Sequence, residues 1–488
     1  MISFLLSLAA LVLGYIFYGR LIERVFQPDN RLTPAVAMAD GIDYIVMPHW
    51  KIFMIQFLNI AGTGPIFGAI MGAKFGPACY LWIVFGCIFA GAVHDYISGM
   101  LSMRNKGDGL PELVGIYLGK HTKRVMLVFS VLLLIMVGTV FVYSPAEILQ
   151  HMWGSSLMWI LVIFAYYVVA TMLPIDKIIG KIYPLFAFAL LFMAVALMAY
   201  LLVKWPTLPE LWDGLGNMGK AADKSFTDEL FPCLFITVAC GAISGFHATQ
   251  SPLMARCVKS ERMGRPIFYG AMITEGVVAL IWATVASYFF YGKPTPACQL
   301  IAGAQTTGFH TSAPAVVNLV CNDWLGMLGG VLALLGVVAA PITSGDTAFR
   351  SARLIVAETF NLNQRAIPKR LIICIPLFLI SIAMLIWQSA NPDGFNVIWQ
   401  YFGWANQTLA VFTLWTATVY LVQQHKPYLI TLIPALFMTT VCTTFLFVSK
   451  QAFGLPVTIG YPLGGATLII AIVWFCLWLH RWKAANDK

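Results

Sequence analysis

The chain reads Asn59-Ile60-Ala61-Gly62-Thr63-Gly64-Pro65-Ile66-Phe67-Gly68 in the middle of residues 50–72, an apolar segment long enough to cross a membrane. Proline removes a main-chain hydrogen-bond donor, and the neighbouring glycines weaken a helix further. In hydrocarbon, main-chain groups that lose their partners must find others, so a broken helix is tolerated only where it faces protein or a water-filled cavity. This stretch therefore predicts a discontinuous membrane helix that lines an interior site.

A second interruption falls in and just after residues 231–249, where the chain reads Ala239-Cys240-Gly241-Ala242-Ile243-Ser244-Gly245-Phe246-His247-Ala248-Thr249-Gln250-Ser251-Pro252. In the order of the apolar segments, the two interrupted ones are five apart and run in opposite directions. Glycine-interrupted spans at corresponding places in two halves indicate the binding site of a secondary transporter. Glycine and proline also serve close helix packing in membranes, but two interruptions at this spacing favour the transporter.

The composition excludes several other classes of protein. Of the 488 residues, 60% are apolar or aromatic and 10% are charged, and the mean hydropathy is +0.81. Soluble domains carry about 25% charged residues, so a soluble enzyme and a disordered scaffold are excluded. The net charge of +9 does not indicate nucleic-acid binding, because the basic residues stand in short gaps between apolar runs rather than on one face.

Thirteen segments of the sequence match the about 20 apolar residues that a membrane helix needs. With the N-terminus outside, the gaps and tail on the inside hold 24 of the 30 Lys and Arg residues, and the outside gaps hold 6, as the positive-inside rule requires. We therefore expect an all-α polytopic membrane protein with a cytoplasmic C-terminus. The predicted spans are residues 3–19, 50–72, 79–101, 124–143, 156–173, 183–204, 231–249, 266–290, 325–344, 368–388, 396–422, 428–449 and 459–480.

The order of these spans predicts how a single transmembrane domain is organised. We expect a first span and a cytoplasmic loop in residues 1–49 and a first repeat in residues 50–204. A second, inverted repeat would occupy residues 231–422, followed by two extra spans and a short cytoplasmic tail in residues 428–488. Each repeat would then begin with one of the interrupted helices.

Few ionisable residues lie inside the predicted spans, where such groups are costly and tend to mark ion or substrate paths. Glu275 lies near the middle of its span, and its neutral form is favoured away from water, so it is a candidate for exchanging a proton near neutral pH. The alternative is a neutral acid that hydrogen-bonds a neighbouring helix. His94 and Asp95 could relay protons as an imidazole beside a carboxylate, although a structural or gating role is favoured.

Other polar residues are candidates for contacting cargo or a coupling ion. Thr343 and Ser344 offer hydroxyl oxygens for Na⁺, but they could also cap their helix. Half-helices that begin at the breaks present N–H groups that suit a carboxylate. Asn406 and Gln407 could line a cavity or hydrogen-bond between helices. The candidate substrate-binding residues are Gly62, Thr63, Gly64, Pro65, Ile66, Ser244, Gly245, Phe246, His247, Asn406 and Gln407.

The ten cysteines are scattered, and their spacing shows no CxxC motif or Cys/His cluster that would indicate zinc or iron. Cys298 and Cys321 share the predicted outside loop of residues 291–324. This loop would face an oxidising compartment, where the two cysteines could form a disulfide. The sequence also lacks HExxH, GxSxG and P-loop motifs. We therefore expect no cofactor other than a coupling ion, H⁺ or Na⁺, and no enzymatic activity.

Five stretches make the chain similar to the carbon starvation protein A (CstA) family. They are Ile60–Ile66, Gly91–Tyr96, Pro174–Pro184, Ile243–His247 and Phe402–Gln407, and they occur in this order over most of the chain. The resemblance implies membership of the amino acid–polyamine–cation superfamily, with a LeuT-like five-plus-five inverted repeat. The chain is shorter than the longest family members, mainly beyond the repeat core, so any function of their C-terminal extension cannot be carried over.

The resemblance further implies a bacterial inner-membrane transporter that is linked to nutrient limitation and takes up peptides or pyruvate with protons. By the same analogy, Gly62–Ile66 and Ser244–His247 would line the substrate site, and Thr343 and Ser344 are the positions to test for Na⁺. We expect an ion-coupled secondary transporter of pyruvate or short peptides in the carbon starvation response. The alternatives are a Na⁺-coupled amino-acid-type symporter, a nutrient sensor with a transporter fold and a channel; the cargo and the oligomeric state stay open.

Overall fold

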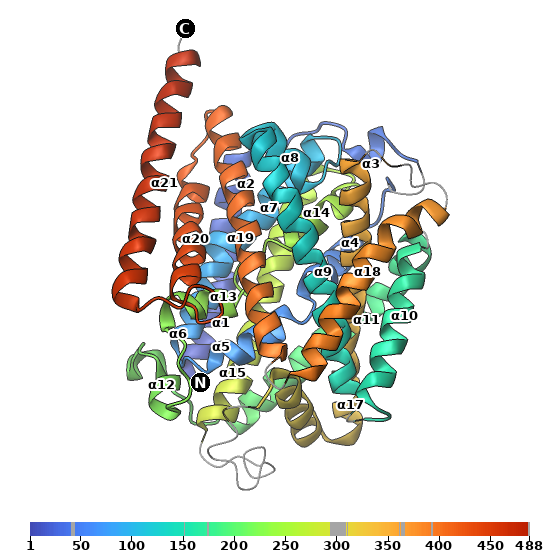
Figure 1. The fold of residues 1–488 in the computed structure, drawn as a ribbon, viewed down its shortest axis with the longest axis vertical. Coiled ribbons are helices and arrows are strands. Elements are labelled where there is room, and N and C mark those ends of the chain that lie inside the picture. The colour runs from blue at the N-terminus through green and yellow to red at the C-terminus, as the bar shows by residue number, and fades with distance from the viewer. Residues whose placement is uncertain are drawn as a thin grey trace.

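The computed structural model describes residues 1–40, 44–150, 152–172, 175–292, 309, 311–360, 362, 367–391 and 394–486. Within these ranges the chain forms helices and no β-strand, which confirms the all-α prediction. Figure 1 shows the long helices packed into one bundle, with the N- and C-terminal ends toward its opposite ends. The elements are α1 Ile2–Leu13, η1 Gly14–Tyr18, α2 Gly19–Phe26, α3 Pro34–Ala37, α4 His49–Ala61, η2 Gly64–Gly68, α5 Ala69–Ala73, α6 Ala78–Leu81, η3 Trp82–Gly91, α7 Ala92–Arg104, α8 Leu110–Leu118, α9 Lys120–Gln150, α10 Ser156–Met172, α11 Ile175–Lys204, η4 Leu211–Asp213, α12 Met218–Ala222, η5 Leu230–Leu234, α13 Phe235–Thr237, α14 His247–Ala255, η6 Glu261–Met263, η7 Arg265–Tyr269, α15 Gly270–Tyr291, α17 Ala313–Thr359, α18 Ile367–Ala390, α19 Gly394–Gln423, α20 Leu429–Val448 and α21 Val457–Asn486.

Several of these helices meet the requirements of a membrane span. Among the described residues, eight are long and apolar enough to cross a membrane, or nine when the bent pair His49–Ala61 and Gly64–Ala73 counts as one span. The finding confirms a polytopic membrane protein, whereas the total of thirteen spans stays a prediction. Figure 1 shows α21 at the edge of the bundle, and only 11% of its most apolar window is buried. Its apolar surface is therefore left to the lipid.

The first predicted break lies between α4 and η2. The helix stops at Ala61, and its direction changes by 52° before it resumes at Gly64. Gly62 has a φ of +48°, a left-handed conformation that is costly for a residue with a Cβ, and a Cβ there would lie 2.6 Å from the Phe141 ring. Pro65 stands in the first turn of the resumed helix, where its missing N–H leaves no bond unmade. The break thus falls at the glycines and the proline that predicted it.

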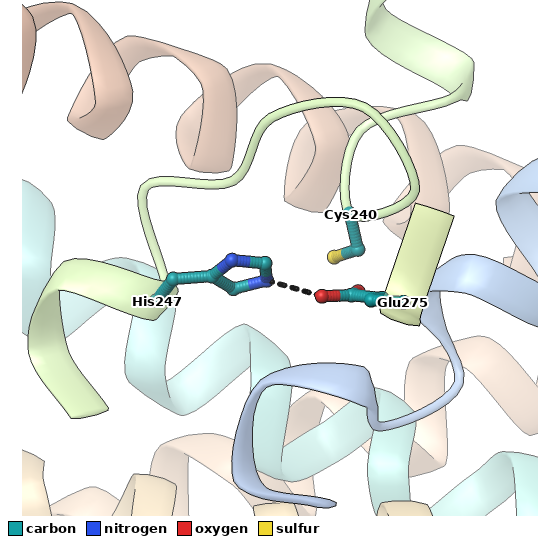
Figure 2. A group of neighbouring side chains, drawn as sticks. All are labelled: Cys240, His247 and Glu275. Carbon is teal, nitrogen blue, oxygen red and sulfur yellow. Dashed lines mark ion pairs between the residues drawn. The ribbon is translucent and has the colours of Figure 1, made fainter. Parts of the chain in front are cut away.

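The second break is longer than the first. α13 ends at Thr237 and α14 begins at His247, and residues 238–246 between them form turns and irregular chain. One tight turn forms within this loop, where the N–H groups of Ala242 and Ile243 donate to the Ala239 oxygen at 3.0 and 2.9 Å. Figure 2 shows how the loop doubles back on itself before α14 begins. We call residues 238–246 the unwound loop.

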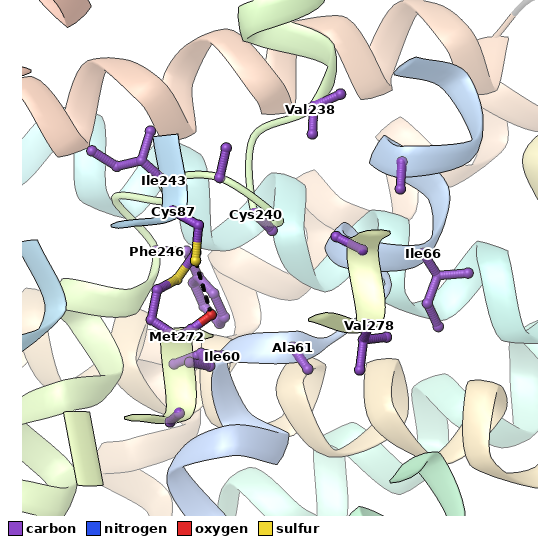
Figure 3. Close-up of a cluster of buried hydrophobic side chains, with 14 of the residues drawn as sticks. Ile60, Ala61, Ile66, Cys87, Val238, Cys240, Ile243, Phe246, Met272 and Val278 are labelled. Carbon is purple, nitrogen blue, oxygen red and sulfur yellow. Dashed lines mark hydrogen bonds between the residues drawn. The ribbon is translucent and has the colours of Figure 1, made fainter. Parts of the chain in front are cut away.

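The two breaks contact each other inside the bundle. Gly64 of the first lies so close to Cys240 of the second that a Cβ on Gly64 would overlap the cysteine side chain. Figure 3 shows Ile66 and Ile243, one from each break, in a cluster that includes Val278 of α15. These side chains are all buried. The breaks therefore face protein rather than lipid, as interrupted membrane helices must.

We expect Gly64→Ala to destabilise the protein, because the added methyl group has no room beside Cys240. Overpacking of this kind costs about 1–3 kcal/mol, so the yield of folded protein in detergent should fall. Cys240→Gly in the same chain removes the opposing Cβ and should restore much of the yield. Gly465→Ala is the control, since a Cβ there meets open space. A Gly64→Ala variant that folds as well as this control would contradict the contact.

The predicted outside loop of residues 291–324 ends in a helix. α17 begins at Ala313, and its course is interrupted at Gly326, whose φ is +63°, beside the predicted start of the following span at residue 325. The position of this segment outside the membrane stays a prediction. Polar residues such as Asn318 and Asp323 lower the hydropathy there, while the helix is held by packing, including a stack of Trp324 on Tyr200 with ring centroids 4.6 Å apart. Cys321 is consequently a buried helical residue. Cys298 lies outside the described residues, so the disulfide stays a prediction.

Candidate functional site

A buried chain of ionisable side chains lies directly after the unwound loop. His247, the first residue of α14, places its Nδ1 2.8 Å from Asp95 Oδ2 and its Nε2 3.4 Å from Glu275 Oε2. The other oxygen of Asp95 lies 2.8 Å from His94 Nδ1. All four side chains are 0% exposed, and Figure 2 shows the His247 ring pointing at Glu275. Three helices, α7, α14 and α15, thus supply one continuous series of proton-binding groups.

The geometry of this series determines which atoms can exchange a proton. An ionised carboxylate only accepts hydrogen bonds, so Asp95 accepts one from each imidazole Nδ1. Nε2 of a neutral His247 then carries the lone pair that faces Glu275. A proton on Glu275 can therefore pass to His247 and form an imidazolium between two carboxylates. The alternative for Glu275, a neutral acid that hydrogen-bonds a neighbouring helix, stays open, because His247 is itself such a neighbour on α14.

Cys240 adds a possible metal ligand to this group. Cys240, His247 and Glu275 each offer one ligand atom, and these atoms lie within 4.8 Å of one another, as Figure 2 shows. Thiolate, imidazole and carboxylate are donors that zinc accepts. The sequence spacing did not indicate such a cluster, because the unwound loop brings Cys240 and His247 together by doubling back. The imidazole and the carboxylate also satisfy each other when they share a proton, so the group does not require a metal.

Asn406 of α19 holds the unwound loop in place. Its Oδ1 accepts hydrogen bonds from Ser244 Oγ at 3.0 Å and from the Phe246 N–H at 2.7 Å. Its main-chain oxygen accepts another from the Gly245 N–H at 3.1 Å. Gln407 Nε2 donates to a main-chain oxygen of α13 at 3.0 Å. Both carboxamides thus bond between segments, which was one of the two roles considered for them.

Ser344 of α17 performs a similar task at the first break. Its Oγ lies 3.2 Å from both the Leu58 and the Asn59 oxygens, in the last turn of α4. Carbonyls in the last turn of a helix have no partner within the helix. Thr343 Oγ1 instead donates to two carbonyls of its own helix, at 3.0 and 2.8 Å. Of the two candidate Na⁺ ligands, Ser344 is the one that bonds to the first break.

Two buried polar atoms close to the first break have no hydrogen-bond partner among the described residues. Asn59 Oδ1 and Thr63 Oγ1 are buried, and neither bonds to any part of the chain that the structure describes. A buried polar atom of this kind costs free energy until it finds a partner. Thr63 belongs to the predicted site, whereas Asn59 was missed. The signal for Asn59 was a carboxamide within one helical turn of Gly62.

A second group of charges, which we call the Arg104 cluster, comprises Arg104, Glu261, Tyr420 and Phe26. Arg104 pairs with Glu261 through two bonds of 3.0 Å each, from Nε to Oε1 and from Nη2 to Oε2. Its Nη1 donates to the Tyr420 hydroxyl at 2.7 Å, and its guanidinium lies 4.1 Å from the Phe26 ring centroid. Glu261 is 1% exposed. Sequence reasoning missed this cluster, because its members come from four separate parts of the chain.

Apolar helices that span a membrane, two of them interrupted and packed against each other beside buried ionisable groups, define a membrane transport protein. The chain belongs to the carbon starvation protein CstA family, whose sequence profile matches residues 1–156, 142–323 and 296–445. The match confirms the resemblance that the five sequence stretches indicated.

Relatives and a solved structure agree with this membership. The chain is 28% identical to the peptide transporter CstA of Campylobacter jejuni, over 88% of this chain and 77% of that protein. It is 28% identical to the pyruvate/proton symporter BtsT of Escherichia coli, over 60% of this chain and 50% of that protein. A crystal structure of an Eremococcus coleocola manganese transporter matches with a TM-score of 0.53 and 12% identity, over 92% of this chain and 98% of that one. The last match shows likeness of fold alone.

Proposed function

We propose that this protein is a proton-coupled secondary transporter that takes up peptides or pyruvate in the carbon starvation response. The names of two relatives, a peptide transporter and a pyruvate/proton symporter, support this class of cargo. Both kinds of cargo carry a carboxylate. The partners of the protein are then a small molecule and the lipid bilayer, with no nucleic acid, no cofactor beyond the coupling ion and no enzymatic reaction.

The observation that carries the proposal is the position of His247. His247 follows the unwound loop directly and connects Asp95 to Glu275. The number of protons on these three side chains therefore determines the net charge beside the breaks. With neutral imidazoles and both carboxylates ionised, the group is doubly negative and repels an anionic cargo. Binding of one proton removes part of this repulsion. Proton binding and cargo binding then favour each other, which is the reciprocal coupling that symport requires.

We also propose alternating access around the breaks, with LeuT-like inverted repeats in residues 50–204 and 231–422. The opposite predicted directions of the two interrupted segments support this arrangement. The likeness in fold to a solved transporter supports it as well. In the structure the residues around both breaks are buried. Cargo would therefore enter and leave through conformations in which one side or the other is open.

We place the protein in the bacterial inner membrane, with the N-terminus outside and the C-terminus in the cytoplasm. The distribution of Lys and Arg between the predicted gaps supports this orientation. The positions of the two termini toward opposite ends of the bundle in Figure 1 support an odd number of crossings.

Na⁺-coupled symport of amino-acid-type cargo is the second candidate function. It is favoured by Ser344 Oγ and the Leu58 and Asn59 oxygens, which are three hard ligands close together at the first break. If Na⁺ is the coupling ion, Ser344→Ala should abolish stimulation of uptake by a Na⁺ gradient. If the coupling ion is the proton, the Ser344→Ala variant should respond to a pH gradient as the wild type does.

The test of the proposed function is uptake by proteoliposomes that contain the purified protein. Labelled pyruvate or dipeptide is supplied under an imposed pH gradient, a Na⁺ gradient or neither. We expect accumulation above the outside concentration with the pH gradient alone, and recovery of unmodified cargo. Equilibration without accumulation would indicate a channel, and binding without any uptake would indicate a sensor.

A further inference from the structure

Lys74 lies at the end of the helical segment that leads away from the first break. The segment runs through η2 and α5 and ends at Ala73. At the rise of an α-helix, the distance from Gly64 to Lys74 is roughly 15 Å. Lys74 also belongs to the gap that the charge distribution assigns to the outside. It therefore stands between the breaks and the side from which a nutrient would arrive.

The ammonium group of Lys74 is buried without an anionic partner in contact. The residue is 6% exposed, and no described residue forms a hydrogen bond or an ion pair with its Nζ. Nζ lies 5.2 Å from the Phe290 ring centroid and 5.5 Å from that of Phe309. Residues 293–308, which lie outside the described part, contain no Asp or Glu that could pair with it.

Aromatic rings form most of the surroundings of this cation. Phe226 packs on both Phe75 and Phe309, with ring centroids 5.0 and 5.5 Å away. The Tyr291 hydroxyl donates to the Lys74 main-chain oxygen at 2.6 Å. Asp223 and Asp228 are the carboxylates that interact electrostatically with the Lys74 ammonium. Burial lowers the pKa of Lys74 to about 8, and these two carboxylates act in the opposite direction, so the group is mostly charged at neutral pH.

Structural roles account poorly for a buried lysine of this kind. A cation at the C-terminal end of α5 is favoured by the helix dipole, and the two rings attract it through their faces. Both effects are small beside the cost of removing a strongly hydrated ammonium from water. An exposed lysine would gain the dipole interaction without that cost. An anion in contact with Nζ would offset this cost.

We propose that Lys74 is a docking site for the carboxylate of the cargo on its way to the breaks. This inference rests on the proposed function and adds to that function the group that recognises the cargo. A carboxylate accepts hydrogen bonds from the ammonium and neutralises it. The rings of Phe290 and Phe309 then offer an apolar surface to the rest of the molecule.

The first test measures uptake kinetics in proteoliposomes with labelled pyruvate. Lys74→Gln should raise KM by about tenfold, the usual worth of a charge-assisted hydrogen bond, and change the maximal rate little. Lys74→Arg keeps the charge and should stay close to the wild type. Lys224→Gln is the matched control, because it removes one exposed positive charge from the neighbouring segment. A folded Lys74→Gln variant with the wild-type KM would overturn the docking site.

The second test does not depend on transport. Amidination of Lys74 by methyl acetimidate is followed by mass spectrometry in the wild-type protein at pH 8, with pyruvate, dialanine or chloride at equal concentration. Pyruvate and dialanine should slow the modification, since a bound carboxylate keeps the amine protonated, and chloride should not. Equal slowing by chloride would overturn the assignment to a carboxylate. If cargo is never accumulated, the proposed function fails, but protection of Lys74 from modification still tests the docking site. The same measurement tests the docking site if the Lys74→Gln variant does not fold.

Discussion

Glu275→Gln is expected to abolish accumulation of cargo driven by a pH gradient while leaving exchange of labelled for unlabelled cargo intact. The substitution keeps the shape of the side chain but removes the proton that it can pass to His247, whose Nε2 lies 3.4 Å away. Accumulation ratios should fall by about a hundredfold, near the upper end of usual coupling free energies. The measurement is uptake of labelled pyruvate into proteoliposomes under an imposed pH gradient, beside counterflow without a gradient.

Glu147→Gln is the matched control for this prediction. Glu147 is a partly buried glutamate of α9 that accepts a hydrogen bond from Ser312 Oγ at 3.1 Å and does not belong to the proton-binding series. Its replacement should leave both accumulation and exchange near the wild-type level. Undiminished proton-driven accumulation by Glu275→Gln would refute the assigned role of Glu275. Loss of exchange as well would indicate that the substitution disturbs the fold or the cargo site.

Glu261→Gln is expected to give the largest loss of stability among single substitutions in the Arg104 cluster. The substitution removes the negative charge of Glu261, whose two oxygens accept hydrogen bonds of 3.0 Å from Arg104. Glu261 is almost completely buried, so the Arg104 guanidinium would be left without its anionic partner. Breaking a buried ion pair from one side costs about 3–5 kcal/mol. Thermal unfolding of the purified protein in detergent, followed by its intrinsic tryptophan fluorescence, should therefore shift to lower temperature.

Glu112→Gln provides the comparison outside the Arg104 cluster. Glu112 pairs with Lys123, and both side chains are partly exposed, so this ion pair contributes about 0–1 kcal/mol. Its loss should leave the unfolding temperature nearly unchanged. Equal shifts for Glu261→Gln and Glu112→Gln would show that the Arg104–Glu261 pair is not a special buried contact.

The local breaks could be predicted from the sequence because their causes are local. A glycine with a positive φ and a proline without an N–H act on the helix that contains them, so Gly62 and Pro65 marked the first break directly. At the second break the glycines act through their size, because a Cβ on Gly245 would lie 2.4 Å from the Asn406 main-chain oxygen. Glu275 could be singled out as a candidate in the same way, because a carboxylate in an apolar span is expensive wherever it points.

The contacts between spans could not be predicted in this way. Nothing in the spacing of Asp95, His247 and Glu275 states that α7, α14 and α15 present these side chains to one another. Neighbours in the sequence also separated: Ser344 bonds to the first break, while Thr343 bonds within its own helix. Cys240 was classed with the scattered cysteines, because its approach to His247 depends on the path of the unwound loop.

The hydrogen bonds of Asn406 make the two breaks mechanically unequal. Three consecutive residues of the unwound loop are bonded to one asparagine of α19, so the second break should move with α19 as a unit. The first break turns at Gly62, whose backbone has wide torsional freedom. A cargo molecule would therefore sit between an anchored surface and a pivoting one, and a compound that stiffens the pivot should arrest the transporter without competing for the anchor.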